Sequence, residues 1–203
     1  MPEYRVTAWL FLRGLGLVYL IAFWSLWGQI IPLSGEHGIM PIADRMEAMR
    51  TNAGDLGAGA KMWRVPTVFW MGSDDRFIKG VCALGCVLAG CVIAGLLTMP
   101  SLAGLWILYL SLVKVCVPWL GFQWDILLLE AGFLGAFVAR LAVFEDPRRL
   151  CAPRLIPLLL VRWLVFRLMF ASGMVKLLSG DAMWADWTAL TVHYETQPLP
   201  NPL

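Results

Sequence analysis

Five long apolar runs dominate the chain, and shorter polar segments separate them. At a rise of about 1.5 Å per residue, roughly twenty apolar residues cross the ~30 Å hydrocarbon core of a bilayer as one α-helix. The pattern therefore predicts an all-α, polytopic transmembrane bundle with about five spanning helices, one module covering the whole chain. The expected spans are 9–28, 77–98, 101–120, 124–143 and 155–176.

Helix-breaking residues separate the middle runs. Pro100 lies in "TMPSL" between the second and third runs, and Pro118 and Gly121 lie in "VPWLGF" between the third and fourth. Proline and glycine are the strongest local breakers of helices. We therefore expect a tight helical hairpin at each place, a long loop over 29–76 and a tail over 177–203.

The second run repeats small residues at a spacing of four. Small residues on one face allow helix backbones to approach closely in lipid. We expect this face to pack against a neighbouring helix. Its members are Cys82, Cys86, Gly90 and Ala94.

Composition supports a membrane protein and excludes other classes. Of 203 residues, 60% are hydrophobic and 15% are charged, whereas about a quarter of the residues in soluble domains are charged. The net charge of +2 gives no electrostatic case for nucleic-acid binding. Five cysteines without a CxxC pair and only two histidines predict neither a disulfide framework nor a metal site. We expect no cofactor.

Basic residues in the short connections predict the orientation, because cytoplasmic loops are enriched in Lys and Arg. The connection 142–154 contains Arg148 and Arg149 and is the most basic short one, so we expect it in the cytoplasm. Five crossings then place the N-terminus in the cytoplasm as well. The loop 29–76 and the tail 177–203 fall on the outer side.

Charged side chains lie within the expected spans, where a charge that faces lipid is costly and usually pairs inside the bundle. We call the set on the third, fourth and fifth spans the polar seam. Its members are Lys114, Gln123, Asp125, Glu130, Arg162, Arg167 and Lys176. The seam has two interpretations, which the sequence leaves open: buried pairs that fix helix register, or a polar cavity open to the outer side.

Depth below the outer surface, at about 1.5 Å per residue, suggests the pairs. Lys114 and Arg167 are alternative partners for Glu130, and Asp125 lies at the same end as Lys176. Deeper basic residues have no acidic residue at their own depth. We therefore expect Arg13 and Arg162 to extend toward the cytoplasmic headgroups.

The tail carries a second group of candidate residues. Its segment "DAMWADWTALTVHY", residues 181–194, has the pattern of an amphipathic helix on the outer membrane surface. The outer-face motif comprises Trp184, His193, Tyr194 and Glu195. Two interpretations stay open for its imidazole and carboxylate: catalytic groups, or a hydrogen-bonded anchor for the tail.

Several segments together resemble the lipase maturation factor family. They are "GEHGIMP", "VPTVFW", "FQWDILLLEAGFLGAF" and "RWLVFRLMFASGMVKLLSGDAMWADWTALTVHYETQPLP", and they occur in the family's order over nearly the whole chain. The resemblance implies an integral membrane protein that assists folding and assembly of secreted lipases. Its partners would be membrane lipid and a secreted client, with the oligomeric state and the client's identity undetermined.

The same resemblance implies a location and a missing part. In eukaryotic members the location is the endoplasmic reticulum membrane, and in a bacterium it would be the cytoplasmic membrane. Family members are considerably longer, with further membrane helices and a C-terminal domain. The chain would then be an N-terminal fragment, and the client-recognising part would lie largely outside it.

A more distant similarity concerns Lys176. Gly173, Lys176, Leu177 and Trp184 are similar to the catalytic-lysine segment of vitamin K-dependent carboxylases, whose transmembrane core is related. The similarity implies Lys176 as a base, since desolvation lowers a lysine pKa. Two functions therefore stay open: a non-enzymatic folding factor, or a carboxylase-like membrane enzyme. No GxSxG motif is present, so the chain is not itself a lipase of the usual kind.

Overall fold

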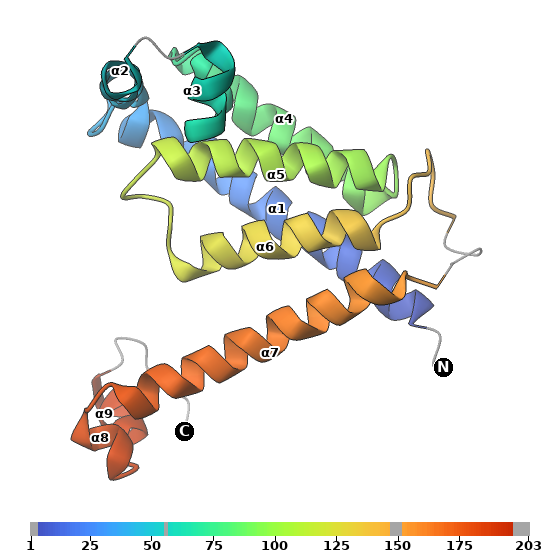
Figure 1. The fold of residues 1–203 in the computed structure, drawn as a ribbon, viewed down its shortest axis with the longest axis vertical. Helices are drawn as coiled ribbons and strands as arrows, with labels where there is room; N and C mark the ends of the chain where they lie inside the picture. The colour runs from blue at the N-terminus through green and yellow to red at the C-terminus, as the bar shows by residue number, and fades with distance from the viewer. Residues whose placement is uncertain (1–3, 55–56, 147–151, 197–203) are drawn as a thin grey trace. The chain divides into compact units, whose positions relative to one another are not determined.

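The computed structural model describes residues 4–54, 57–146 and 152–196, and its regular elements are helical (Figure 1). The helices are α1 (Arg5–Ser34), α2 (Ile42–Ala53), α3 (Ala58–Arg64), η1 (Val68–Trp70), α4 (Asp75–Ala94), α5 (Thr98–Val115), α6 (Gln123–Val138), α7 (Leu155–Leu178), α8 (Ala182–Ala185) and α9 (Ala189–Thr196). The chain divides into two compact units, 1–159 and 160–203. Arg148, Arg149 and the proline-rich end 197–203 lie outside the described residues.

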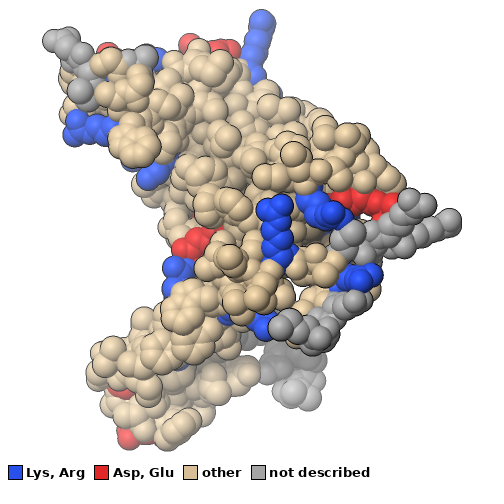
Figure 2. All heavy atoms as spheres, turned by 45° about the vertical axis from the view of Figure 1, so that its right-hand side comes forward, with Lys and Arg blue, Asp and Glu red and all other residues tan. Residues whose placement is uncertain are grey.

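The prediction of an all-helical membrane protein is confirmed. Among the described residues, α1, α4, α5 and α7 are long and apolar enough to cross a membrane. α1 is longer than the expected 9–28 and includes Pro32 near its end. Most of the face in Figure 2 is formed by residues other than Lys, Arg, Asp and Glu, as contact with lipid requires.

The first unit is a four-helix bundle. α1 packs along α4, α4 packs on α5, α5 on α6, and α6 closes the ring against α1. In Figure 1, α5 and α6 lie side by side. Outside this ring, α2 and η1 cover part of α5 and bury Ile42, Met46 and Phe69 almost completely. The expected loop 29–76 is therefore a partly helical cap.

The helix expected over 124–143 is shorter than predicted, because α6 ends at Val138 after 16 residues. The following residues are extended and bond to the turn between α4 and α5. Leu97 N–H donates to the Val143 carbonyl at 2.9 Å, and Glu145 N–H donates to the Gly95 carbonyl at 2.9 Å. Because these backbone groups already have hydrogen-bond partners in the turn between α4 and α5, the helix does not have to continue in order to satisfy them. α6 and the extended residues after it together run antiparallel to α5, from the last turn of α5 back to its first.

The prediction that Pro100 breaks the helix is wrong. α4 ends at Ala94, and Gly95 follows in the left-handed region at φ 80°, where glycine carries no steric penalty. α5 begins at Thr98, so Pro100 occupies its first turn. A proline there removes an N–H that has no intrahelical partner in any case. Pro118 lies between α5 and α6, as expected.

The packed face of α4 agrees with the predicted small-residue face at Cys82, which is fully buried, and departs from it further along the helix. Gly85 and Ala89 are buried on it, whereas a Cβ at Gly90 would meet nothing within 4 Å. A strict spacing of four rotates by about 40° per step around a helix of 3.6 residues per turn, so it drifts off any one face. Alternating steps of three and four stay on the face that contacts α1.

Close contact between α1 and α4 depends on Gly85. A Cβ at this position would collide with the ring of Phe23 on α1, and that ring is 0% exposed and has no room to move. Gly132 on α6 likewise lies against the hydroxyl of Tyr19. Glycine is thus required where aromatic rings of α1 enter the bundle.

We expect Gly85→Ala to destabilise the bundle by about 1–3 kcal/mol, the usual effect of overpacking a core. Gly90→Ala, on the same helix, is the matched control and should leave stability unchanged or slightly raised, because alanine favours helix over glycine. The thermal midpoint of purified protein in detergent, followed by circular dichroism, tests this order. Equal midpoints for the two variants would contradict it.

The second unit contains α7 from Leu160 onward, followed by two short helices. The single helix expected over 181–194 is replaced by α8 and α9. Trp187 takes a left-handed conformation at φ 60°, and Thr188 N–H donates back to the Met183 carbonyl at 3.0 Å. This turn interrupts the helical hydrogen bonds. Asp181 caps α8 by accepting from Met183 N–H at 2.9 Å.

Candidate functional site

Asp125 lies in the first turn of α6 and is buried, with 3% of its surface exposed. The Tyr109 hydroxyl donates to its Oδ1 at 2.6 Å. The backbone N–H groups of Gly121 and Phe122 donate to its Oδ2 at 3.0 Å each. Hydrogen bonds to an ionised carboxylate are the strong kind. Asp125 therefore fixes the start of α6 and ties it to α5.

Tyr109 also belongs to an aromatic cluster that joins three helices. Its ring packs edge-on against Tyr19 and Phe23, with centroids 5.9 and 5.7 Å apart. The Tyr19 hydroxyl donates to the Leu128 carbonyl of α6 at 3.1 Å. α1, α5 and α6 are therefore held together by phenol groups as well as by apolar contact.

Sequence reasoning missed both tyrosines because it treated them as apolar. The depth argument that it applied to charges would not have found Tyr109 either, because the expected span 101–120 places this residue about 16 Å below the outer end, whereas Asp125 lies about 2 Å below it. Tyr109 lies about six residues before the end of α5, and Asp125 lies in the first turn of the antiparallel α6. The partner expected for Asp125, Lys176, belongs to the second unit, so that pair stays a prediction.

The remaining seam residues of the first unit differ in exposure. Glu130 is half-buried on α6, whereas Lys114 and Gln123 are exposed. The choice between Lys114 and Arg167 as the partner of Glu130 stays a prediction. Among the seam residues of the first unit, Asp125 is the one whose side chain is fully buried.

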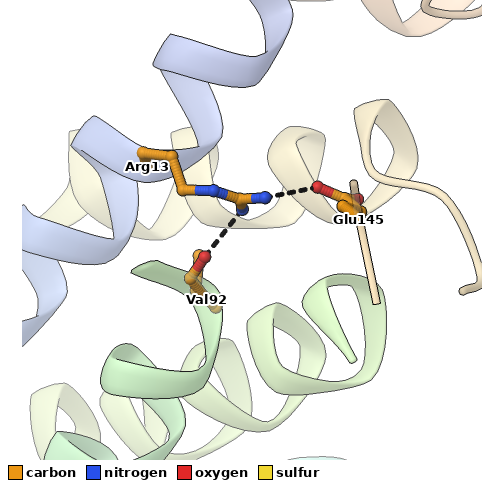
Figure 3. A network of polar contacts seen from close by, with 3 residues as sticks. All are labelled: Arg13, Val92 and Glu145. Carbon is orange, nitrogen blue, oxygen red and sulfur yellow. Dashed lines mark hydrogen bonds and ion pairs between the residues drawn. The ribbon is translucent and has the colours of Figure 1, made fainter. Parts of the chain in front are cut away.

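A second polar network lies at the opposite end of the bundle, and Figure 3 shows its three residues. Arg13 of α1 donates from Nη2 to Glu145 Oε2 at 2.7 Å and from Nη1 to the Val92 carbonyl at 2.7 Å (Figure 3). The side chains of Arg13 and Glu145 are only 11% and 14% exposed. The Arg13 guanidinium also lies over the Trp9 ring, 5.3 Å from its centroid.

The expectation that Arg13 lacks an acidic partner is therefore wrong. Glu145 follows the expected fourth span, so sequence reasoning placed it in a loop outside the bundle. In the structure, the extended residues after α6 return to the turn between α4 and α5 and bring Glu145 against α1. The network shows that the start of α1 and the segment 139–146 lie at the same end.

The second unit contains the remaining candidates. Lys176 Nζ lies 4.7 Å from the centroid of the Trp184 ring, which is the geometry of a cation–π contact. The two arginines of α7, Arg162 and Arg167, are exposed.

The outer-face motif is exposed as well. The His193 and Tyr194 rings are neighbours, 5.9 Å apart, and the side chains of His193, Tyr194 and Glu195 are all exposed. Their two interpretations, catalytic groups or anchor, both stay predictions. The described residues contain no group of three or more His, Cys, Asp or Glu that could hold a metal ion.

Long apolar helices joined by buried polar contacts define an integral, multi-pass membrane protein. The description "Lipase maturation factor transmembrane domain" matches residues 6–203. The chain belongs to the lipase maturation factor family, and this confirms the resemblance stated above. No solved structure matches the chain.

Individual relatives agree with the family assignment. The chain is 43% identical to lipase maturation factor 2 of Rattus norvegicus over 220 residues, which cover 100% of the chain and 30% of the relative. It is 42% identical to the Homo sapiens protein of the same name, with 100% and 30% covered. It is 33% identical to lipase maturation factor 1 of Bos taurus, with 97% and 36% covered. The chain thus spans about a third of these relatives.

The pair formed by Arg13 and Glu145 should be energetically coupled. We expect Arg13→Gln and Glu145→Gln each to lower stability, by about 3 kcal/mol, because either one leaves a partly buried charge without its partner. The double variant should lose less than the sum of the two single losses. A double-mutant cycle on thermal or denaturant unfolding in detergent measures this coupling.

Lys79→Gln serves as the control, since Lys79 is exposed on α4; its effect should stay within about 0.5 kcal/mol. Purely additive losses in the cycle would show that the contact contributes nothing specific.

Proposed function

We propose that this chain is the membrane module of a factor that assists maturation of secreted lipases. The family match over residues 6–203 carries the proposal. The printed names of the relatives support a role in lipase maturation. Client lipases and membrane lipid are the proposed partners.

The arrangement of polar groups favours a scaffold over a reaction centre. The Asp125 carboxylate receives three hydrogen bonds within the bundle, and Arg13 bonds to both Glu145 and Val92. Groups satisfied in this way fix helix positions and are not poised to react. A rigid bundle is suited to holding other parts of a longer protein at the membrane.

The cap formed by α2, α3 and η1 offers a surface for a client. Its apolar side chains Trp63 and Met71 are 89% and 80% exposed. Lys61 and Arg64 lie beside Trp63 on α3. Exposed aromatic and methionine side chains adapt to different apolar partners. We propose that this cap contributes to contact with incompletely folded secreted protein.

The function is tested by rescue of a client lipase. Cells that lack the endogenous factor would express a secreted lipase with this chain, with a full-length relative, or with neither. We expect the full-length relative to raise the activity per secreted lipase molecule. A rise with this chain as well would place maturation activity within its helices and cap. No rise with either protein would contradict the proposal.

Two variants in the same assay distinguish the scaffold function from the alternative, an enzyme that uses Lys176 as a base. Lys176→Arg keeps the positive charge and the contact with the Trp184 ring, but an arginine cannot act as the base. Lys176→Ala removes both. Under the scaffold function we expect Lys176→Arg to retain activity at normal protein levels. Loss of activity in both variants, with normal accumulation, would favour the enzyme.

We further propose a cytoplasmic N-terminus, in the endoplasmic reticulum membrane of a eukaryotic cell or the cytoplasmic membrane of a bacterium. The basic residues of the connection 142–154 support this orientation, and the contact between Arg13 and Glu145 supports a common side for that connection and the start of α1. The cap and the tail would then face the lumen or the periplasm.

Glycosylation in microsomes tests the orientation. The sequence contains only two asparagines, Asn52 and Asn201, and neither begins an Asn-x-Ser/Thr acceptor site. Gly54→Ser creates one at Asn52, within the cap. We expect this variant to gain a glycan and the double variant with Asn52→Gln to lose it again. An unglycosylated Gly54→Ser, beside a glycosylated lumenal control protein, would reverse the orientation.

A further inference from the structure

A cavity of about 220 Å³ lies in the cap, between α2 and α3 (Figure 1). Met49 of α2, Val65 and Trp70 form an apolar wall, and Lys61 and Arg64 of α3 line the same cavity. Lys61 is half-buried and Arg64 is exposed, so both charges can be reached from outside. The cavity therefore combines an apolar wall with two accessible cations.

Hydrogen bonds hold the apolar wall to the bundle. The Trp70 indole N–H donates to the Val65 carbonyl at 2.9 Å. In the short helix η1, the Val68 N–H donates to the Ser111 hydroxyl of α5 at 3.0 Å, and the next residue, Phe69, is 0% exposed. A wall that is already fixed loses little conformational freedom when a partner binds.

The face of α3 that borders the cavity is separate from the most exposed ring of that helix. Residues at i, i+3 and i+4 share one face of a helix, and Lys61, Arg64 and Val65 have this spacing. Trp63, which is 89% exposed, is not among the described residues that line the cavity. A partner can therefore contact the cations and the apolar wall together without contacting Trp63.

The two cations have no counter-charge within the described part of the chain. Neither Lys61 nor Arg64 forms an ion pair with a described residue, and no carboxylate occurs among the described residues that line the cavity. An ammonium and a guanidinium are hydrogen-bond donors without acceptor atoms, and their bonds to anionic oxygens are of the strong, charge-assisted kind. The complementary group is therefore an anion.

The size of the cavity limits the source of that anion. Small-molecule sites usually enclose about 300–1,000 Å³, so a cavity of about 220 Å³ is too small for a drug-sized ligand or for the paired chains of a phospholipid. One apolar side chain of a polypeptide fits better. In an extended polypeptide, residues i and i+2 point to the same side. An Asp or Glu two positions from the apolar residue then faces Lys61 and Arg64.

We propose that this cavity binds an extended acidic segment of the secreted client, with one apolar side chain against Met49, Val65 and Trp70. Carboxylates two residues before and after that side chain pair with Lys61 and Arg64. This inference rests on the proposed function, in which the cap contacts incompletely folded secreted protein. Because folding buries most large apolar side chains, a folded client no longer offers such a segment.

Peptide binding by the purified full chain in non-ionic detergent tests the cavity. The probe is a short fluorescent peptide with the pattern Glu-x-Leu-x-Glu, and fluorescence anisotropy gives its Kd. We expect Lys61→Gln and Arg64→Gln each to weaken binding about threefold, as the loss of one accessible ion pair implies, and the double variant to weaken it about tenfold. The same peptide with glutamine in place of both glutamates should bind the parent protein about tenfold more weakly.

Reversal of the charges gives a second test. The double variant Lys61→Glu with Arg64→Glu should bind a peptide with lysine in place of both glutamates more tightly than the parent protein does. Thermal midpoints equal to that of the parent would show that the variants are folded. A folded charge-reversed variant that still prefers the acidic peptide would overturn the proposal.

Arg50→Gln is the matched control, because Arg50 is an exposed cation of α2 that is not among the described residues lining the cavity. This variant should bind the acidic peptide like the parent protein. Weakening as large as that of Arg64→Gln would show that the overall charge of the cap attracts the peptide, and would overturn the assignment to this cavity. Unchanged binding in the folded double variant Lys61→Gln with Arg64→Gln would overturn it as well.

A lipid headgroup is the other occupant that the experiment distinguishes. Phosphatidylglycerol retained from mixed micelles, counted by native mass spectrometry, should be equal for the parent protein and the double variant Lys61→Gln with Arg64→Gln. Loss of retained lipid in the double variant, with unchanged peptide binding, would assign the cavity to lipid and overturn the proposal.

Separate readouts distinguish a failure of the cavity from a failure of the proposed function. Peptide binding is measured without a lipase, and lipase rescue is measured without the peptide. Rescue by the full-length relative, together with equal peptide binding by the parent and the double variant, would overturn only the cavity. No rescue by either protein, together with peptide binding in the expected order, would overturn the proposed function and leave the cavity as a site for acidic peptides.

Discussion

The absence of water in the hydrocarbon core is the constraint on which the rest of this structure depends. A polar group there must find its partner within the protein, because an unsatisfied one costs several kcal/mol. Asp125 meets this requirement with Tyr109 and two backbone N–H groups. Arg13 meets it with Glu145 and the Val92 carbonyl. These two networks lie toward opposite ends of the first unit. The Asp125 network ties the consecutive helices α5 and α6, whereas the Arg13 network joins residues that are distant in sequence.

Between the two networks, the bundle is held by close packing of aromatic rings against glycine. Phe23 lies against Gly85, and Tyr19 lies against Gly132. Lipid provides no hydrophobic driving force between helices, so van der Waals contact at short range has to supply the association. Tyr19 adds a hydrogen bond to the Leu128 carbonyl. The same ring thus provides packing and satisfies its own hydroxyl.

This division of roles bears on function. Asp125, which belongs to the polar seam that first suggested a cavity, is engaged in holding α5 and α6 together. Large apolar side chains are exposed elsewhere, on the cap, where Trp63 and Met71 face outward. A membrane module built in this way is suited to presenting a surface on a rigid bundle.

The sequence alone determined the class of protein, since hydropathy and length follow directly from the need to cross a bilayer, and its long motifs determined the family. It also located the connection at Pro118. Tertiary structure decided the pairing of charges. Glu145 reaches Arg13 only because the chain after Val138 leaves the helix and bonds to the turn at Gly95. Helical periodicity carries no information about such a return, because its hydrogen bonds join segments about fifty residues apart.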